Sequence, residues 1–448
     1  MLCIPKAAEP LVSAMSCVFT RRTFERFRLL MIGAILAGGK HCLSGVLWPV
    51  MGLSKGHWSD FYRVFSRAPW SMWPLGRILA AGALRLIASG QVVHLVIDDT
   101  LCRHSGPKVY ARGTFRDAVR STNVSNFFSF GHRWLVVSIL VKPPLVSRLW
   151  ALPVLIALCR TPEQDLVEKR RHKTDVDLAR VLTLTLVRWF PERRFVAIGD
   201  GEYGRRTLAR DLLGGGATLV SRLPDNAALY DAPRPVEGKV RGRPRVRGRK
   251  RRCPREAVKG KKFRAVRVRW ADGSRRHMKV YSDVARWSRP GQGFVTIRWV
   301  CLRKDDGFRA FLFSTDPSMT PEQIVETYSL RWNIEVTFQL CREHLGLESP
   351  RQRAAKSVER MTPCLFGLFT VVALVYAASV AGRTVPKKLA RSRPWYTKTE
   401  PTFSDALAHV RGLFLRALFI APRSGAHTAT SPPWPDATAL LLRLANAA

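Results

Sequence analysis

The chain has 448 residues, 46% of them hydrophobic and 24% charged, which is enough for two or three domains with a sizeable core. Lys and Arg number 74 against 33 Asp and Glu, so the formal net charge is +41. The hydrophobic content excludes a disordered polycation, and so large an excess of positive charge destabilises a compact state unless a polyanion binds. Nucleic acid is the expected polyanion, and an anionic membrane surface is the competing partner.

The cysteines and the N-terminus indicate the cellular compartment. The nine cysteines include no CxxC pair, and none has histidines at zinc-finger spacing, which argues against a metal finger and a secreted disulfide framework. The first residues, "MLCIPKAAEPLVSAM", contain an acidic residue and an interrupted apolar run, so they make a poor signal peptide. We therefore predict a cytoplasmic protein.

Residues 1–85 are predicted to form a helical N-terminal domain. The segments "FERFRLLMIGAILAGG" and "WPLGRILAAGALRLIASG" have apolar residues at helical spacing. Between them, "KGHWSDFYRVFSRAPW" mixes aromatic and basic residues. That mixture fits a DNA-contacting helical segment and plain helix packing equally well, so both interpretations stay open.

The character changes after residue 85. β-Branched runs at 92–100 and 133–141, and shorter apolar runs at 194–204 and 217–223, are typical of strands. Helical patterns cover 175–190 and 205–213. Strands and helices in this order predict an α/β fold with a mixed sheet, and we assign 86–228 to the first part of a core domain.

A basic and β-rich insertion is predicted at 229–318. Its first part, "EGKVRGRPRVRGRKRRCPREAVKGKKFR", is dominated by Lys, Arg, Pro and Gly and will not fold alone. The strand-like runs "HMKVYSDV", "FVTIRWVCLR" and "FRAFLFST" follow. Within the basic tract, Arg241, Arg243 and Arg245 are candidate DNA-binding residues, because Arg241-Gly242-Arg243-Pro244 resembles an AT-hook core and narrow A·T minor grooves attract Arg. A solvated, disordered loop is the alternative.

One helix is predicted from "TPEQ" at 320–323 to Gly346. Thr320 is the expected N-cap, Gln323 stands three positions later, and Gly346 is a suitable stop. On such a helix Glu335 lies in the middle and is held rigidly.

A mixed-charge line runs along this predicted helix, beside an apolar stripe. At offsets of three, seven and fourteen, its four members fall within about 60° of one another: Tyr328, Arg331, Glu335 and Arg342. A catalytic carboxylate with basic neighbours would occupy such a line at the edge of a core. Helical ion pairs on a solvated face are the alternative.

The segment "CLFGLFTVVALVYAASVAG" at 364–382 has no charge over about the length of a bilayer crossing. It contains Gly, Thr, Ser and Tyr and directly follows the helix with the mixed-charge line. We predict a buried helix of a soluble domain and no membrane partner, with a membrane span as the rival interpretation. Residues 319–383 then complete the core domain, and 384–448 form a basic C-terminal tail for which dimerisation is one role.

Carboxylates stand at three places that could meet. Asp98 and Asp99 end the first strand, Asp200 follows the strand at 194–199, and Glu335 is on the helix. Mg²⁺ prefers oxygen ligands and keeps several waters, and two ions about 4 Å apart can activate a nucleophile and stabilise the leaving oxygen at a phosphodiester. Each motif alone is more typical of a turn or a cap, but their combination in so basic a chain favours phosphodiester chemistry.

The motifs together resemble those of insertion-sequence DDE transposases. The mixed-charge line matches the spacing Y-x2-R-x3-E-x6-K, with Arg342 in place of the Lys. Asp200-Gly201-Glu202-Tyr203 resembles the family's second-Asp motif, and Asp98-Asp99-Thr100 resembles its first. The match makes Asp98 the first metal contact and Asp99 the filler position, and the reverse order stays open. The resemblance covers roughly residues 90–380.

The resemblance implies an RNase H-like catalytic fold with a β-rich insertion before the last catalytic helix. It implies strand cleavage by water and transfer of a 3′-hydroxyl to target DNA, with two Mg²⁺ or Mn²⁺ ions. Asp98, Asp200 and Glu335 would hold the metal ions, while Tyr328, Arg331 and Arg342 would grip phosphates. The partners would be double-stranded DNA at the transposon ends and the target, and a second copy of the chain once the ends are bound. A prokaryotic, nucleoid-associated protein is expected.

Rival functions remain at the level of the sequence. An RNase H-like nuclease would cut DNA without joining it, and a catalytically decayed transposase would only bind DNA. Two further residues near the motifs have structural as well as functional interpretations. His132 fits a structural polar residue better than a functional one, and Trp332 fits the core, although it could stack on an unpaired base.

Overall fold

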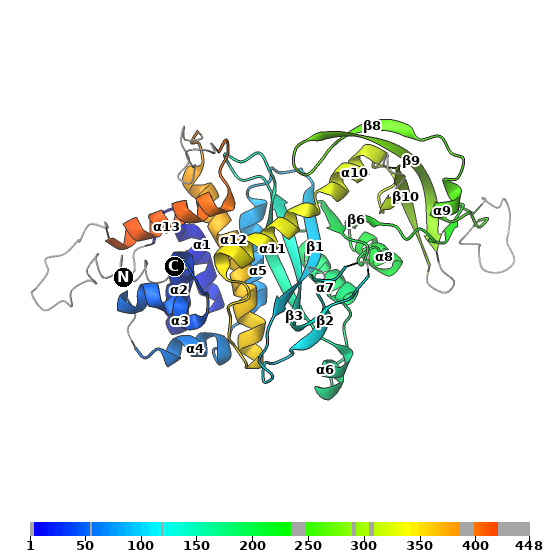
Figure 1. Cartoon of the computed structure of the whole chain (residues 1–448). Helices are drawn as coiled ribbons and strands as arrows, with labels where there is room; N and C mark the ends of the chain where they lie inside the picture. Colours follow the sequence, from blue (N-terminus) through cyan, green and yellow to red (C-terminus); the bar gives the residue numbers. More distant parts are fainter. Residues whose placement is uncertain are drawn as a thin grey trace, which may run out of the picture.

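The computed structural model describes residues 4–53, 56–117, 120–122, 124–233, 248–288, 293–303, 309–384 and 398–419. The N-terminal helices lie on one side, a large sheet occupies the middle, and the strands that follow residue 228 form the other side (Figure 1). This arrangement confirms the predicted α/β class with a mixed sheet flanked by helices.

The sheet has eleven strands in the described part of the chain, with the path β2-β3-β1-β5-β6-β11-β10-β9-β7, while β4 pairs with β3 and β8 with β9. β1 is antiparallel to β3 and parallel to β5, which is parallel to β6. The strands are β1 Val93–Arg103, β2 Gly113–Arg116, β3 Phe128–Val141, β4 Trp150–Cys159, β5 Phe195–Gly199, β6 Ala217–Arg222, β7 Leu229–Tyr230, β8 Arg264–Arg269, β9 Arg275–Ser288, β10 Phe294–Arg303 and β11 Arg309–Ser314.

Helices pack on this sheet and on one another. They are α1 Glu9–Met15, α2 Arg21–Leu36, α3 Leu43–Leu47, α4 Ser59–Ser66, α5 Met72–Leu84, α6 Pro162–Val167, α7 Asp175–Trp189, α8 Arg206–Gly214, α9 Pro254–Ala257, α10 Pro321–Ser329, α11 Trp332–Leu345, α12 Ala355–Val380 and α13 Phe403–Phe419, with 3₁₀ turns at Ser16–Val18 and Trp48–Leu53. Helix α13, which the sequence analysis did not separate from the C-terminal tail, packs on α12 and α2.

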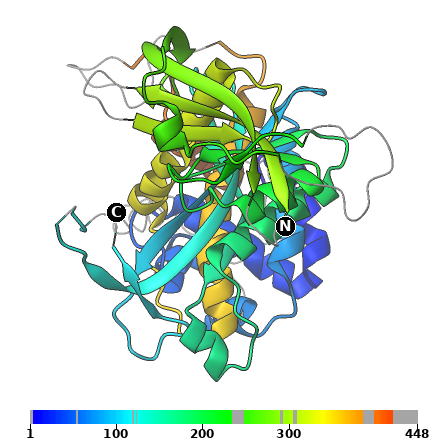
Figure 2. The same cartoon turned by 90° about the vertical axis from the view of Figure 1, so that its right-hand side faces the viewer.

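The strands at 229–318 do not form a separate sheet. β11 pairs antiparallel with β6, with Leu312 opposite Arg222 and Ser314 opposite Val220. The backbone groups along one side of β6 are therefore satisfied by the insertion. In Figure 2 its green strands lie above the cyan strands of the first part, in one continuous sheet.

The predicted helix from Thr320 to Gly346 is in fact two, so this prediction was wrong in one respect. Both of its ends are as expected: Thr320 caps α10 in a capping box with Gln323, and Gly346 ends α11 with φ of 54°. Between α10 and α11, the N–H of Arg331 bonds to the carbonyl of Tyr328 in a three-residue turn. Such turns wind more tightly than an α-helix, so the mixed-charge line is not straight. Glu335 lies in the first turn of α11, not in the middle of a long helix.

Helix α12 is the apolar segment that raised the membrane alternative. It is the only described helix long and apolar enough to cross a membrane, with a mean hydropathy of 2.0, and 83% of that window is buried inside the protein. It packs against β4, α5, α4 and α13. Because α12 is covered on several sides by its own chain, packing in the core explains its apolar composition.

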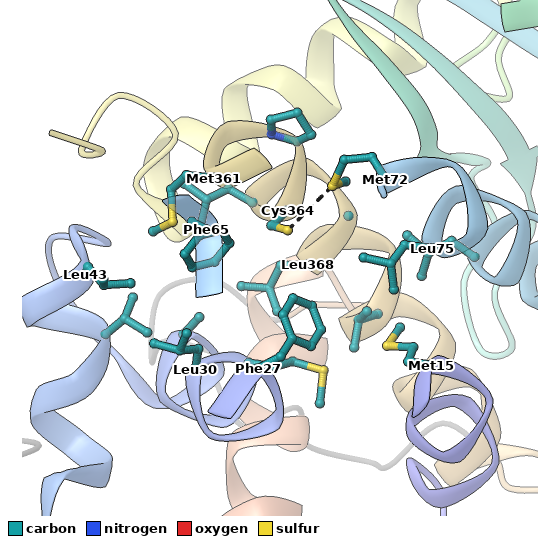
Figure 3. Close-up of a pocket in the computed structure, with 18 residues that line it drawn as sticks. Met15, Phe27, Leu30, Leu43, Phe65, Met72, Leu75, Met361, Cys364 and Leu368 are labelled. Atoms are coloured by element: carbon teal, nitrogen blue, oxygen red, sulfur yellow. Dashed lines mark hydrogen bonds between the residues drawn. The ribbon is translucent and has the colours of Figure 1, made fainter. Parts of the chain in front are cut away.

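The N-terminal helices and the core domain share one hydrophobic core. Apolar side chains of α1 to α5 meet those of α12 around a cavity of about 70 Å³ (Figure 3). Phe27, Leu30 and Leu368 are among its labelled lining residues, and the sulfur atoms of Met72 and Cys364 are 4.0 Å apart. Residues 1–85 are therefore not packed independently of the rest of the chain.

Arg360 of α12 holds the N-terminal helices by hydrogen bonds to their carbonyl groups. The residue is 9% exposed. It donates to the carbonyls of Phe65 and Ala68 at 3.0 Å and of Trp70 at 2.5 Å. Its guanidinium also lies 4.5 Å from the centre of the Trp70 ring. This side chain thus binds carbonyl groups in the last turn of α4 and in the segment that follows it.

Arg360→Met is therefore expected to lower the free energy of unfolding by about 3 kcal/mol, because it keeps the aliphatic stem but leaves buried carbonyls unpaired. Denaturant unfolding would measure the change. Lys356→Met, at an exposed position of the same helix, is the matched control and should change stability little. Equal stabilities of the two variants would contradict the role of Arg360.

Buried histidines predict a loss of stability in acid. Burial lowers the pKa of His41, His94 and His132, and it lowers that of His104 to about 4, helped by His132 and Arg351. The rings of His104 and His132 lie 4.7 Å apart. A histidine whose folded pKa is depressed binds fewer protons in the folded state, so its contribution to stability falls as pH drops below about 6.5.

We expect the His104→Gln variant to lose less stability than the unaltered chain between pH 6.5 and about 4, by up to about 2 kcal/mol. Asp98, whose pKa is raised, has the opposite sign over this window, so the difference between the two proteins is the relevant quantity. Urea unfolding at several pH values would measure it, with His277→Gln at an exposed strand position as the control. Parallel pH profiles for His104→Gln and the unaltered chain would disprove the prediction.

Candidate active site

Asp98 and Asp99 point to opposite faces of β1, because side chains alternate along a strand. Asp98 lies on the face covered by α11, where its Oδ2 accepts a hydrogen bond from Nη1 of Arg331 at 2.9 Å. Its Oδ1 accepts one from the backbone N–H of Asp99, also at 2.9 Å. Asp99 is bound by Arg133 on the other face.

Asp200 emerges beside Asp98 because β1 and β5 are parallel neighbours. Ile97 pairs with Gly199, so Asp98 and Asp200 follow directly opposite residues. Asp200 comes after the end of β5, whereas Asp98 lies within β1, which runs on to Arg103 and does not end at the aspartates as the sequence predicted. Oδ1 of Asp200 accepts a hydrogen bond from the N–H of Glu202 at 2.8 Å, and its backbone carbonyl accepts one from Oγ of Ser221 at 2.6 Å. The turn after β5 thus holds Asp200 at this edge.

Negative charge is concentrated around Asp98. The pKa of its carboxyl group is raised to about 7, mainly by burial and also by the nearby Asp99 and Asp200, against the opposing effect of Arg331. A carboxyl group in such surroundings gains a proton or a cation near neutral pH. The site is thus built to attract a cation.

Arg331 bridges the two elements of the site. Its Nη2 is 2.5 Å from Oε1 of Glu335, while its Nη1 binds Asp98. The guanidinium therefore lies between the carboxylate of β1 and that of α11. Within the described ranges, no three Asp, Glu, His or Cys side chains converge closely enough to hold a metal ion, and between Asp98 and Glu335 the cation present is the guanidinium of Arg331.

The donor set nevertheless fits a hard divalent cation. Asp98, Asp200 and Glu335 offer only oxygen ligands, which Mg²⁺ prefers. The pKa of Asp98 is raised chiefly by burial, which disfavours a charged carboxylate without a compensating cation. Release of Arg331 would leave both of its carboxylate partners open to a metal ion.

The remaining residues of the mixed-charge line are spread along the same face. Tyr328 is partly buried on α10, and burial raises the pKa of its hydroxyl, with Arg331, Arg222 and Asp200 as neighbours. Arg342, near the end of α11, donates to the hydroxyl of Thr100 and to the carbonyl of Leu101. The structure therefore groups Tyr328, Arg331 and Glu335 near the aspartates and places Arg342 farther along β1.

The other candidate residues differ in how far they are exposed. Trp332 is 58% exposed beside Arg331, so it is not a core residue. His132 is buried and its Nε2 lies 2.7 Å from the carbonyl of Tyr110, which accounts for it structurally. Arg241, Arg243 and Arg245 lie outside the described residues.

The sequence analysis missed an arginine on the opposite face of the sheet. Arg133 binds Asp99, Asp175 and Glu202 there. The sequence did contain a signal. Arg133 is a charged residue at the start of the apolar run of β3, and the residues that the two Asp motifs leave unspecified, Asp99 and Glu202, are both acidic. The sequence could not show that the side chain of Arg133 forms ion pairs with both Asp99 and Glu202.

Comparisons with known proteins identify the family of the chain. Residues 14–277 match the family model described as DDE superfamily endonuclease. Residues 290–375 match one described as "Archaeal putative transposase ISC1217". A solved structure, the cryo-EM structure of the piggyBac transposase synaptic complex with hairpin DNA, is similar with a TM-score of 0.41 and 13% identity, over 98% of this chain and 80% of that one. The search of curated proteins gave no match.

The first family match reaches from α1 past the two strands that carry Asp98 and Asp200, and it covers more than half of the chain. Such coverage includes strands β1 to β8 but not β10, β11 or the helix that carries Glu335. The chain therefore belongs to the DDE superfamily endonucleases, a family of enzymes that cleave nucleic acid.

Proposed function

We propose that this chain is a DNA transposase of an insertion sequence, which cleaves transposon ends and transfers the strands to target DNA. The observation that carries the proposal is the position of Asp98 and Asp200 on neighbouring parallel strands. Glu335 is linked to Asp98 because Arg331 binds both carboxylates. The match of residues 290–375 to a transposase family model supports strand transfer over simple cleavage.

We assign the strands β4-β3-β1-β5-β6 to an RNase H-like core. They carry both aspartates, mix parallel and antiparallel pairs, and bear helices α11 and α12. The strands β7 to β11 are then the β-rich insertion between the second aspartate and the last carboxylate. This assignment rests on the resemblance of the motifs and on where the strands place them.

Asp98, Asp200 and Glu335 are proposed to hold one or two Mg²⁺ or Mn²⁺ ions. A bound ion of this kind supplies an activated water and stabilises the charge that develops on the leaving oxygen. Arg331 neutralises Asp98 and Glu335 in the free protein. When its guanidinium turns to a phosphate, with which it can make bidentate contacts, it leaves the two carboxylates free.

The other side chains of this face are proposed to orient the DNA. Tyr328 is close enough to Arg331 to share a phosphate with it. Arg342 lies beside Thr100 and would contact the backbone farther from the cleaved bond. Exposed Trp332 offers a ring on which an unpaired base could stack. Since two ends must be brought together, a homodimer on DNA is expected.

The basic tract is proposed as a second DNA contact. Each lost phosphate contact flattens the slope of log K against log salt by roughly 0.9 on duplex DNA. Replacing Arg241, Arg243 and Arg245 by Ser should therefore flatten it by about 3 units while cleavage at saturating protein survives. An unchanged slope in a filter-binding titration would assign the tract to a solvated loop.

The function is tested by supplying pre-cleaved end DNA, with a free 3′-hydroxyl, and a supercoiled target. The DNA on either side of the reading frame is sequenced first, because inverted repeats there would identify the end sequence to use. Joined products after incubation with the chain and Mg²⁺ are the expected result. Cleavage of intact ends without any joining would instead favour an RNase H-like nuclease, and DNA binding without either reaction would favour a decayed transposase.

A further inference from the structure

Behind the candidate active site, one arginine binds three carboxylates. Nε of Arg133 lies 2.6 Å from Oδ2 of Asp99, and its Nη2 donates to Oδ1 of Asp99 at 3.0 Å. The same Nη2 lies 3.0 and 3.1 Å from the two carboxylate oxygens of Glu202. Nη1 pairs with Asp175, at the start of α7, at 2.9 Å. The arginine side chain is 24% exposed, so water screens these contacts only in part.

Two of these partners also orient the candidate catalytic carboxylates. The backbone N–H of Asp99 donates to Oδ1 of Asp98, and the backbone N–H of Glu202 donates to Oδ1 of Asp200. Each aspartate of the site thus accepts a hydrogen bond from the residue whose own side chain Arg133 holds. The guanidinium thus connects β1 with the turn after β5 through a path of four hydrogen-bonded contacts: Asp98 to Asp99, Asp99 to Arg133, Arg133 to Glu202, and Glu202 to Asp200.

The surroundings of Arg133 fix this arrangement. The hydroxyl of Tyr203, a fully buried residue, donates to Oδ1 of Asp99 at 3.1 Å. A side chain at Gly199 would meet Tyr203 at 2.7 Å, so the turn after β5 packs tightly against that ring. With Tyr203 packed in this way, Asp99 and Glu202 have little freedom to move apart.

We propose that Arg133 is a positioning residue for DNA cleavage, which sets the spacing of the Asp98 and Asp200 carboxylates by holding Asp99 and Glu202. This inference rests on the proposed function, because the spacing matters for the metal ions that the two aspartates would hold. Arg133 itself touches neither of them. It acts from the opposite face of the sheet, through two backbone N–H groups.

A structural ion pair is the competing interpretation, and the chain contains a matched example. Arg160, directly after β4, is also poorly exposed and also pairs with two carboxylates, Asp165 at 2.6 Å and Glu168 at 3.0 Å. Neither of these acidic residues adjoins a candidate catalytic residue. Loss of Arg160 should therefore lower stability without disturbing the site.

The test compares Arg133→Gln with Arg160→Gln in the full chain. Binding of Mn²⁺ to the protein without DNA is followed by electron paramagnetic resonance of the free ion. Arg133→Gln should weaken Mn²⁺ binding about 10- to 100-fold, the usual effect of losing a residue that supports metal ligands. Arg160→Gln should change it less than about twofold, and Arg133→Lys should recover only part, because an ammonium group cannot make the bidentate contact.

Cleavage kinetics supply a second measurement. In Arg133→Gln the turnover number should fall while the KM for DNA holds, and excess Mn²⁺ should restore much of the lost rate. Equal Mn²⁺ affinities for Arg133→Gln and Arg160→Gln would overturn the proposal. If Arg133→Gln fails to fold, the milder Glu202→Gln replaces it. Glu202→Gln should weaken Mn²⁺ binding several-fold, and an Mn²⁺ affinity equal to that of Arg160→Gln would again overturn the proposal.

Asp200→Asn separates this inference from the proposed function. If Asp200→Asn abolishes Mn²⁺ binding and Arg133→Gln leaves it unchanged, only the role of Arg133 fails. If the unaltered chain and Asp200→Asn bind Mn²⁺ equally, the metal site itself is wrong and the proposed function fails with it.

Discussion

Asp98→Asn, Asp200→Asn and Glu335→Gln are each expected to abolish DNA cleavage while the chain remains folded and bound to DNA. Each replacement keeps the size of the side chain but removes a negative oxygen ligand. A fall in rate of at least about 10³-fold, equivalent to about 4 kcal/mol of barrier, is expected for the loss of a metal-holding group. Gel assays of end cleavage measure the rate, and circular dichroism and DNA retardation check folding and binding.

Two further variants calibrate this result: a control that should cleave normally and a variant with an intermediate effect. Glu343→Gln alters an exposed carboxylate of the same helix, 59% exposed at its side chain, and should cleave normally. Asp99→Asn should retain cleavage at about one tenth of the rate, recoverable with Mn²⁺, because its side chain supports the site from the opposite face. If Asp98→Asn retained cleavage and Asp99→Asn lost it, the assignment of the first ligand would be wrong.

Removal of divalent metal ions is expected to stop the reaction completely. Mg²⁺ and Mn²⁺ should support cleavage, while Ca²⁺ should support DNA binding with little cleavage because its looser coordination positions the nucleophile poorly. Because the pKa of Asp98 without metal is raised to about 7, a metal ion competes with a proton for this carboxylate below that pH. The apparent affinity for Mg²⁺ should therefore rise with pH up to about 7 and level off above it.

Cleavage measured against Mg²⁺ concentration at several pH values checks this prediction. Because the Asp98→Asn protein is not expected to cleave, its Mn²⁺ binding, measured directly at the same pH values beside that of the unaltered chain, is the control for the group that competes for the proton. Full cleavage in excess EDTA would contradict the use of metal ions. An affinity for Mg²⁺ that is independent of pH between 5 and 8 would contradict a protonated Asp98, with its pKa of about 7, in the metal-free site.

The local features of the site were predictable because they depend on residues close together in the chain. The strand that carries Asp98, the strand before Asp200, the cap at Thr320 and the stop at Gly346 all follow from short patterns, although β1 continues to Arg103 and does not end at the aspartates as predicted. The α/β class with a mixed sheet was also correct. The resemblance to a DDE family agrees with the family match, although its four-residue helix signature stays a prediction.

The break at Leu330 and Arg331 was not predictable from periodicity. Both residues have helical backbone angles, so a helical pattern continues through them. What changes is the hydrogen bonding, which Asn333 reinforces by donating from its side chain to the carbonyl of Leu330 at 2.8 Å. A count at 100° per residue cannot detect a local tightening of this kind.

The sequence by itself determined which residues could carry out the chemistry, because carboxylates after apolar runs and a capped helix are encoded within a few positions. Only the tertiary structure decided how they are used. Arg331 is 233 positions from Asp98, Arg133 is 69 from Glu202, and β11 joins β6 across the whole insertion. Pairings over such distances depend on the register of strands and the docking of helices, which minimise unpaired buried charge and backbone groups across the whole fold.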